Sequence, residues 1–257
     1  MKITRKELRG IILEGLNFDY LNNTVLLKCK EGNVIYYLLL DAKITELIDQ
    51  LFGRLKEITD EDDWGNYTKT KPLISVLMSD YNHMIYGMAQ RLHTRGPLNS
   101  SEIKMFAAQP GWGPTLYDIV MGDCDGIIAD RNSVSPDAYA VYDYYNKNRP
   151  DIQRTPLDSV YHKWTPNPND DTTWGASARY SNPYAGDTKD KTITRDRFIN
   201  DPLNWVYNRD PVPGAEQAYS NSGALLAVFD KWSTFDPEDV LDYFTEKLAL
   251  KFFFSKY

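Results

Sequence analysis

The chain has 257 residues, of which 42% are hydrophobic and 25% are charged. This composition is typical of an ordinary globular protein, and it excludes a wholly disordered or collagen-like chain. The formal net charge of −7 supplies no general positive field for phosphates, so nucleic acid is disfavoured as a partner. Two cysteines, Cys29 and Cys124, stand in no CxxC motif and beside no histidine. They argue against a disulfide framework or a zinc site, and we expect no metal.

The sequence contains neither a predicted membrane span nor a predicted secretory signal. The longest apolar run extends from Val34 to Leu40, far short of the roughly 18 residues that a membrane-spanning helix needs. The N-terminal stretch MKITRKELRGIILEG has charges among its apolar residues and lacks a small-residue cleavage site. Its Thr4 and Glu7 form a capping-box pattern that predicts a short amphipathic helix. We therefore expect a cytoplasmic protein that makes no contact with a membrane.

The next elements are predicted from hydrophobic periodicity and turn residues. Two extended runs flank Glu31-Gly32-Asn33 and predict a β-hairpin. Apolar residues at helical spacing from Ile44 to Leu55 then predict a helix. Three further extended runs predict successive antiparallel strands. These runs cover residues 73–78, 84–92 and 102–107.

A glycine-containing loop, QPGWGPT, separates the last of these strands from a helix predicted over residues 116–121. Gly111 and Gly113 let the backbone bend with its amides exposed, and free N–H groups at the start of the following helix can bind an anion. Residues 126–130 predict a short apolar strand, and Ser135 predicts the N-cap of the next helix. The predicted order is strand, glycine loop, helix, strand, helix.

The second half of the chain has a different composition. Residues 146–213 are rich in Pro, Asn, Asp and Thr, which favours turns, but their tryptophans are costly to expose. We therefore expect a loop-rich, ordered insertion. Residues 214–232 are compatible with a helix, and Asp236 predicts the N-cap of a last helix. The predicted organisation is an N-terminal helix, hairpin and helix over residues 1–66 on the same core, a main domain over 67–232 and a C-terminal helix over 233–257.

Two stretches resemble a known family. MFAAQPGWGPTLYDIVM, from Met105, and GIIADRNSVSPDAYAVYDYY, from Gly126, look like motif A and the following strand and helix of the GCN5-related N-acetyltransferases. The likeness is to the acetyltransferase-like proteins of tailed, T4-like bacteriophages in particular, and it covers about residues 72–150. It implies an α/β (α+β) fold with a mixed, mostly antiparallel sheet and flanking helices. The fourth strand of that sheet diverges from the fifth.

The resemblance also implies a chemistry. In that family acetyl-coenzyme A lies between the two diverging strands, and loop amides hold its pyrophosphate. The implied reaction is acetyl transfer to an amine, on a small molecule or a protein, by direct attack. The implied cofactor-binding residues are Phe106, Ala107, Ala108, Gly111, Trp112, Gly113, Pro114, Thr115 and Leu116.

The resemblance points to one acid and leaves the base open. Ala138 and Tyr142 match the family's AxxxY pattern, so Tyr142 is the predicted general acid for the departing thiolate. Three further tyrosines crowd the same predicted helix, and core packing is the alternative role for Tyr142. Glu102 is a candidate general base at the head of its strand. The other base candidates are Asp80, His83 and His93.

Two other functions stay open beside the enzyme. Pro110 stands where the family has Gln or Arg, and Thr115 replaces a Gly or Ala. This altered loop and the large insertion are compatible with a non-catalytic binding or virion-associated protein on the same scaffold, rather than an enzyme in the cytoplasm of an infected cell. A nucleic-acid-modifying enzyme would need arginines gathered at the cleft. The candidate arginines are Arg91, Arg95, Arg131, Arg149 and Arg154.

Overall fold

The computed structural model describes residues 19–58, 82–93, 99–130, 134–156, 201–232, 246 and 249–250. Several predictions lie outside these residues. They are the N-terminal helix, the strand at 73–78, most of the 146–213 insertion and most of the last helix. In the part of the chain that is described, no helix is long and apolar enough to cross a membrane.

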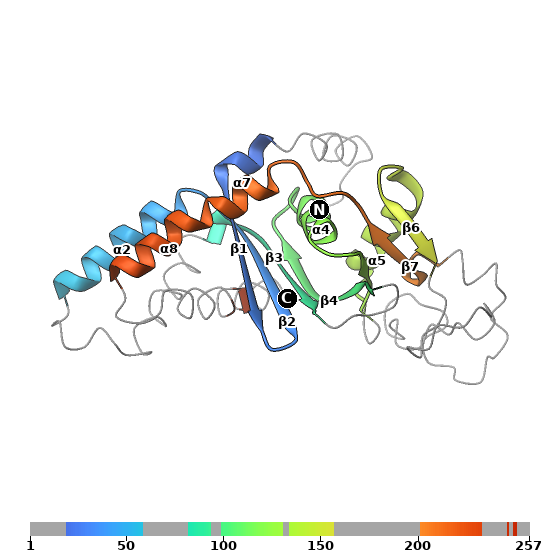
Figure 1. Ribbon diagram of the computed structural model, residues 1–257, viewed down its shortest axis with the longest axis horizontal. Helices are drawn as coiled ribbons and strands as arrows, with labels where there is room; N and C mark the ends of the chain where they lie inside the picture. The colour runs from blue at the N-terminus through green and yellow to red at the C-terminus, as the bar shows by residue number, and fades with distance from the viewer. Residues whose placement is uncertain are drawn as a thin grey trace. The chain divides into compact units, whose positions relative to one another are not determined.

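A mixed, mostly antiparallel open sheet organises the described residues, and helices accompany it (Figure 1). Its strand order is β1-β2-β3-β4-β5-β7-β6. The strands are β1 (Thr24–Glu31), β2 (Val34–Asp41), β3 (Ile85–Leu92), β4 (Ser101–Ala108), β5 (Ile127–Ile128), β6 (Gln153–Pro156) and β7 (Trp205–Asn208). The helices are α2 (Ile44–Ile58), α4 (Gly113–Gly122), α5 (Pro136–Asn148), α7 (Ala215–Ser220) and α8 (Ser222–Trp232). Short 3-10 turns are η1 (Asp19–Asn23), η3 (Asn82–Met84) and η5 (Pro202–Asn204). The predicted mixed α/β class is confirmed at this level.

The chain divides into two compact units, each built from separate stretches of sequence. Unit 1 comprises Met1–Gln90, Met105–Tyr117 and Val212–Tyr257, and unit 2 comprises Arg91–Lys104 and Asp118–Pro211. The predicted domain boundaries at 66/67 and 232/233 remain predictions.

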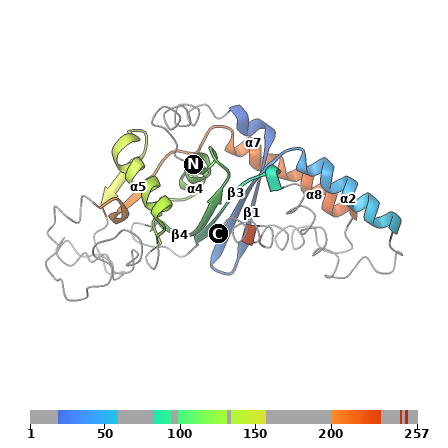
Figure 2. The same ribbon diagram turned by 180° about the vertical axis from the view of Figure 1, so that it is seen from behind.

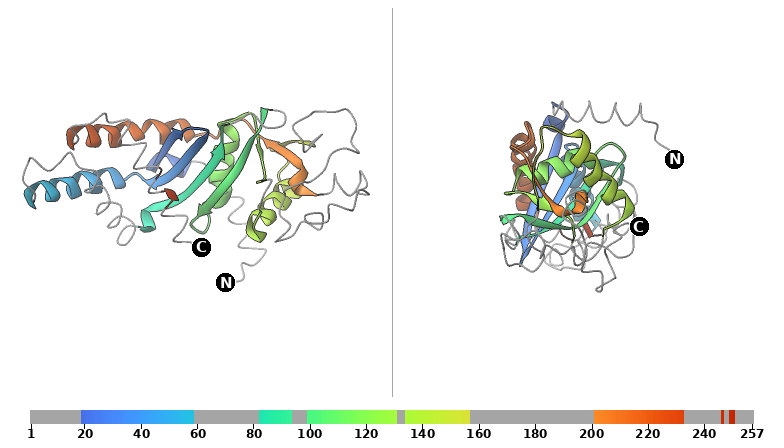
Figure 3. Two further views of the ribbon diagram at one scale, coloured as in Figure 1. Left: turned by 90° about the horizontal axis from the view of Figure 1, so that it is seen from below. Right: turned by 90° about the vertical axis from the view of Figure 1, so that its right-hand side faces the viewer.

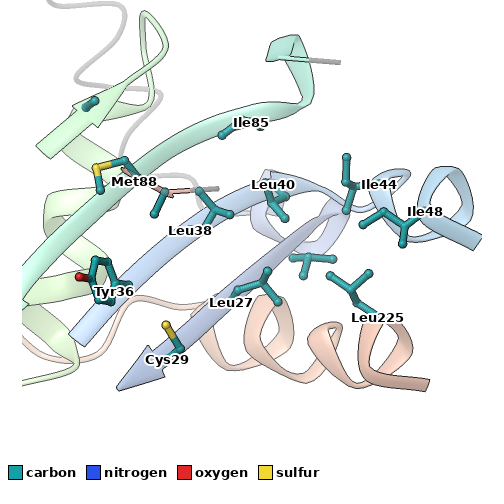
Figure 4. Packing of buried hydrophobic residues seen from close by; sticks show 13 residues of the cluster. Leu27, Cys29, Tyr36, Leu38, Leu40, Ile44, Ile48, Ile85, Met88 and Leu225 are labelled. Atoms are coloured by element: carbon teal, nitrogen blue, oxygen red, sulfur yellow. The ribbon is translucent and has the colours of Figure 1, made fainter. Parts of the chain in front are cut away.

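Unit 1 is built on the β1–β2 hairpin, which the sequence predicts correctly. Gly32 has φ +55 in the turn, where glycine avoids the steric penalty of a side chain. The strands pair in antiparallel register from Thr24 opposite Asp41 to Glu31 opposite Val34. One face of the hairpin carries buried side chains that meet α2 and α8 (Figure 4). The labelled core residues are Leu27, Cys29, Tyr36, Leu38, Leu40, Ile44, Ile48, Ile85, Met88 and Leu225.

Helices α2 and α8 run alongside each other in unit 1 (Figures 1, 2 and 3). An ion pair links them at 2.8 Å between Lys231 Nζ and Asp49 Oδ1. The single helix predicted over 214–232 is instead two helices separated at Asn221. The side-chain amide of Asn221 donates to the backbone carbonyl of Thr24 at 2.8 Å, so a tertiary contact accompanies the break.

Unit 2 corrects the prediction for the 146–213 insertion. Residues 153–156 and 205–208 are not loop but strands of the sheet, β6 and β7, which pair in antiparallel register. Each is four residues long and contains no clear alternation of apolar and polar side chains. Hydrophobic periodicity therefore does not identify either segment as a strand. The strand predicted at 126–130 is shorter than expected. The helix predicted after Ser135 is confirmed as α5, with the Ser135 hydroxyl accepting from the Ala138 amide at 3.2 Å.

Candidate functional site

The loop between β4 and α4, within unit 1, has the bent backbone that its glycines predict. The Gln109 amide donates to the Tyr86 carbonyl at 2.8 Å, which extends the pairing of β4 by one residue. The Trp112 amide then donates to the Gln109 carbonyl at 3.1 Å and closes the turn. Gly111 has φ +91, a conformation that glycine adopts without a side-chain clash. The chain thereby reverses from strand to helix in a few residues.

The amides at this bend are the chemically useful feature. Among the described residues, no hydrogen bond uses the amide of Gly111 or Gly113 as its donor. The first helical bond of α4 runs from the Leu116 amide to the Trp112 carbonyl at 3.0 Å. Unsatisfied N–H groups and the positive end of the helix dipole make such a start a site for an anion.

The space beside the two glycines is also open within the described part of the protein. A Cβ added at Gly111 would meet nothing within 4 Å. A Cβ added at Gly113 would meet only Cε1 of Phe106, at 4.0 Å, an ordinary contact distance. The backbone at these positions therefore fits close approach by a ligand such as a diphosphate.

The other predicted cofactor-binding residues divide into two groups. Ala107, Thr115 and Leu116 are buried, so their side chains are not offered to a ligand at the surface. Phe106, Ala108, Trp112 and Pro114 are partly exposed. The Phe106 ring stacks on Tyr117 at a centroid distance of 3.8 Å. The end of the strand and the loop predicted from the sequence thus lie together in unit 1.

A chain of contacts that the sequence did not predict holds the loop. The Trp112 ring stacks on Tyr86 with centroids 3.9 Å apart and planes 6° from parallel. The Tyr86 hydroxyl donates to Oδ2 of Asp41 at 2.7 Å, while Oδ1 accepts from the Lys43 amide at 2.9 Å. Asp41 therefore connects the start of α2 to the loop through one aromatic stack. The only local sign of these contacts in the sequence was the position of Asp41 between an apolar strand and a helix.

Replacing Tyr86 by phenylalanine should keep the stack on Trp112 and remove the hydrogen bond to Asp41. We expect the free energy of unfolding to fall by about 1–2 kcal/mol, because a partly buried hydrogen bond to a carboxylate is lost. Urea unfolding measures this change. Tyr219→Phe is the matched control, since that tyrosine is 53% exposed. An equal effect of the two substitutions would contradict the role of Tyr86.

The comparison of the wild type with Tyr86→Phe also gives an expected result at alkaline pH. Burial first, and then the hydrogen bond and charge of Asp41, raise the pKa of Tyr86 above its ordinary value of about 10. A phenol whose pKa is raised by folding stabilises the fold below its unfolded pKa and loses that contribution as the pH rises. The stability difference between wild type and Tyr86→Phe should therefore be largest near neutral pH and shrink above about pH 10.

Glu102, the candidate base, belongs to unit 2 and is already engaged in an ion pair. Its Oε1 lies 2.7 Å from Nζ of Lys104, which also lies 3.2 Å from Oδ1 of Asp130. Burial alone would lower the pKa of Lys104, but Glu102 and Asp130 outweigh it and raise that pKa. The catalytic role of Glu102 stays a prediction. Of the other candidates, His83 and His93 are exposed, and Asp80 lies outside the described residues.

Tyr142, the candidate general acid, lies on α5 within a cluster of aromatic side chains in unit 2. Its side chain is buried, and its ring centroid is 5.5 Å from that of Tyr207. The Tyr207 hydroxyl donates to the Pro202 carbonyl at 2.6 Å and to the Tyr142 carbonyl at 3.3 Å. This environment is what core packing would produce, and the acid role of Tyr142 stays a prediction.

A buried ionic cluster around Asp118, also in unit 2, was missed by sequence reasoning. Asp118 Oδ2 lies 2.9 Å from Nη2 of Arg149 and 2.6 Å from Nη1 of Arg209. Burial raises the pKa of Asp118, and the two arginines oppose this shift. Burial alone would lower the pKa of Arg149, but Asp151 and Asp118 outweigh it and raise that pKa. The hydrogen bond from Arg149 in turn lowers the pKa of Asp151. Three largely enclosed charges, of Asp118, Arg149 and Arg209, thus compensate one another, and the more exposed Asp151 pairs with Arg149 from the outside.

The arginines considered for nucleic-acid binding are partly committed inside the protein. Arg149 belongs to the cluster just described, and Arg91 donates to the Ser101 hydroxyl at 2.9 Å and to Asp123 at 3.3 Å. Arg154 donates to the carbonyl of Asn146. Arg95 and Arg131 lie outside the described residues. A nucleic-acid function therefore receives no support from Arg91 and Arg149.

No protein family, no curated protein and no solved structure matches this chain. The resemblance to the GCN5-related N-acetyltransferases accordingly remains a prediction. Among the described residues, no group of three or more His, Cys, Asp or Glu side chains is placed to hold a metal ion.

Proposed function

We propose that this protein is an acyl-coenzyme A-dependent N-acetyltransferase of the GCN5-related type, which transfers the acetyl group of acetyl-coenzyme A to an amine. One observation carries the proposal. Strands β4 and β5 are parallel and joined through the glycine loop and α4, but among the described residues they pair only at Ser101 with Ile127 and Glu102 with Ile128. Ligands bind where parallel strands separate at their carboxyl ends. This arrangement supports the divergence of strands that the resemblance implies.

The proposed roles follow from the chemistry of the acyl donor. The amides of Gly111 and Gly113 hold its pyrophosphate, and the backbone of Phe106 to Ala108 runs beside its pantetheine arm. The acceptor amine attacks the thioester carbonyl carbon, the carbon–sulfur bond breaks, and the thiolate leaves with a proton. Tyr142 is the proposed source of that proton, and Glu102 is the proposed acceptor of the proton from the amine.

The second candidate function is a non-catalytic binding or virion-associated protein on the same scaffold. The burial of Tyr142 and the ion pair of Glu102 with Lys104 favour it, because a group that transfers a proton must reach the substrate. Measuring free thiol released from acetyl-coenzyme A with a panel of primary amines separates the two functions. Thiol release that depends on the amine supports the enzyme, and binding without release supports the second candidate.

The Gly113→Ala variant tests the loop. We expect isothermal titration to give acetyl-coenzyme A binding by the wild type and binding at least about tenfold weaker by the variant, equivalent to about 1.4 kcal/mol. The reason is that the methyl group would occupy the space through which the phosphate approaches the amides. The protein itself tolerates this methyl, since its nearest contact is at 4.0 Å.

Gly223→Ala is the matched control for that variant. Gly223 also lies at the start of a helix, α8, and a Cβ there meets nothing within 4 Å. Gly223→Ala should therefore leave the binding of acetyl-coenzyme A unchanged. Absence of heat from the folded wild type at high cofactor concentration would overturn the proposed function. Equal affinity of wild type and Gly113→Ala would remove the loop from the site.

A further inference from the structure

Residues 82–86, where β3 begins, hold the glycine loop at three points, all within unit 1. The Tyr86 carbonyl accepts from the Gln109 amide at 2.8 Å. The Asn82 carbonyl accepts from Nε2 of the Gln109 side chain at 3.2 Å. The Tyr86 ring stacks on Trp112 with centroids 3.9 Å apart. The first two contacts fix the first residue of the loop, and the stack fixes its centre.

Trp112 lies between the two glycines whose amides are the proposed ligands of the pyrophosphate. Neither glycine has a side chain that could hold its own backbone, which is freer than that of any other residue. The peptide plane between Trp112 and Gly113 carries the Gly113 amide, so the backbone of Trp112 sets the direction of that N–H group. Its amide donates to the Gln109 carbonyl at 3.1 Å, and its carbonyl accepts from the Leu116 amide at 3.0 Å. Of these contacts and the stack on Tyr86, only the stack joins the loop to another strand of unit 1.

The Tyr86 ring is itself held by Asp41, the last residue of β2. The Tyr86 hydroxyl donates to Oδ2 of Asp41 at 2.7 Å, and Oδ1 accepts from the backbone amide of Lys43 at 2.9 Å. A hydrogen bond to an ionised carboxylate is stronger than one to a neutral acceptor, and this carboxylate is anchored through both of its oxygens. The Tyr86 ring is engaged at its hydroxyl and on one face, so it is restrained in the orientation that stacks on Trp112.

We propose that Tyr86 and Asp41 are positioning residues for the anion site of the glycine loop. Through the ring of Trp112 they keep the amides of Gly111 and Gly113 in the direction that can receive the pyrophosphate of acetyl-coenzyme A. The inference rests on the proposed function. A loop that occupies its binding conformation for only a fraction of the time loses affinity in proportion to that fraction. Removing the Tyr86 ring should therefore weaken binding although no atom of the anion site is removed.

The first test is isothermal titration of acetyl-coenzyme A into Tyr86→Leu, which removes the stacking ring. We expect binding at least about tenfold weaker than in the wild type, as for a loop in its binding conformation about a tenth of the time. Tyr86→Phe keeps the ring and loses the hydrogen bond to Asp41, so its affinity should fall only about two- to threefold. Wild-type affinity in Tyr86→Leu would overturn the inference and leave the proposed function standing.

Tyr36→Phe is the control that separates positioning from stability. Tyr36 also belongs to unit 1, its side chain is 5% exposed, and its hydroxyl accepts from Nε2 of Gln90 at 3.2 Å. It lies on β2 five residues before Asp41, or about 17 Å along the strand. Losing this hydrogen bond should lower the free energy of unfolding but leave the affinity for acetyl-coenzyme A unchanged. A loss of affinity in Tyr36→Phe as large as in Tyr86→Leu would contradict the positioning role.

A double variant tests whether Tyr86 acts through Trp112. Trp112→Leu should weaken binding, and adding Tyr86→Leu to it should weaken binding no further, because the stack is already absent. Trp112→Phe keeps an aromatic ring against Tyr86 and should recover most of the affinity that Trp112→Leu loses. Fully additive effects of the two leucine substitutions would mean that Tyr86 acts on the ligand by another route, and would overturn the inference.

A second measurement needs no ligand. Exchange of the Trp112 and Leu116 amides, whose hydrogen bonds close the loop and begin α4, should be at least about fivefold faster in Tyr86→Leu than in the wild type. Exchange at the wild-type rate would show that the stack does not order the loop and would overturn the inference. Faster exchange with no acetyl-coenzyme A binding by the wild type would overturn the positioning role together with the proposed function. If Tyr86→Leu does not fold, Tyr86→Phe takes its place, with both effects expected at about two- to threefold.

Discussion

Replacing Asp118 by alanine is expected to lower the free energy of unfolding by about 3–5 kcal/mol, because it leaves buried guanidinium groups without their shared carboxylate. The Asp118 side chain is 1% exposed, and those of Arg149 and Arg209 are 7% and 11% exposed. Arg149 keeps Asp151 as a partner at 2.6 Å. Arg209 loses Asp118, its closest carboxylate, because the remaining acid, Asp151, is as far as 3.9 Å away.

The measurement is urea unfolding of Asp118→Ala beside a matched control. Asp143→Ala removes the carboxylate of an exposed ion pair on α5, with Lys147 at 2.7 Å. Its effect should stay below about 0.5 kcal/mol, as for other exposed pairs. Similar losses in the two variants would mean that burial does not strengthen the cluster. Asp118→Asn should fall between them, because it keeps an acceptor and loses the charge.

Replacing Gly126 by alanine is expected to lower the free energy of unfolding by about 2–4 kcal/mol, through backbone strain and overpacking together. Gly126 has φ +134, which residues with a side chain rarely adopt. An added Cβ would lie 2.6 Å from Cγ1 of Val206 and 3.2 Å from the Tyr207 carbonyl oxygen. Either β7 must shift away from β5 or Gly126 must change conformation.

Two further variants separate the strain from the clash. The double variant Gly126→Ala with Val206→Ala removes the closest contact but leaves the unfavourable φ, so it should show less than the sum of the two single effects. Gly223→Ala, in open space on α8, should be neutral or stabilising by up to about 1 kcal/mol. A Gly126→Ala protein as stable as the wild type would contradict the backbone conformation at this residue.

The elements that sequence reasoning predicted correctly are those with local causes. The hairpin around Gly32 follows from a turn that needs positive φ, and α5 follows from the hydroxyl of Ser135 capping its own helix. The loop of Gly111 and Gly113 is local in the same sense, since two glycines and a following helix start are read from adjacent residues. The candidate anion site was therefore predictable from a short stretch of sequence.

The contacts that surround this site were not predictable, because their partners are far apart in the chain. Tyr86 and Asp41 are separated by 45 residues, Lys104 and Asp130 by 26, and Arg209 and Asp118 by 91. Likewise, four-residue strands such as β6 and β7 become strands by pairing with each other across the chain. Local composition by itself determined the hairpin, the helix starts and the glycine bend. Only the tertiary structure decided which charges were buried together and where the pairing of β4 with β5 stopped, because both depend on neighbours that no sequence window contains.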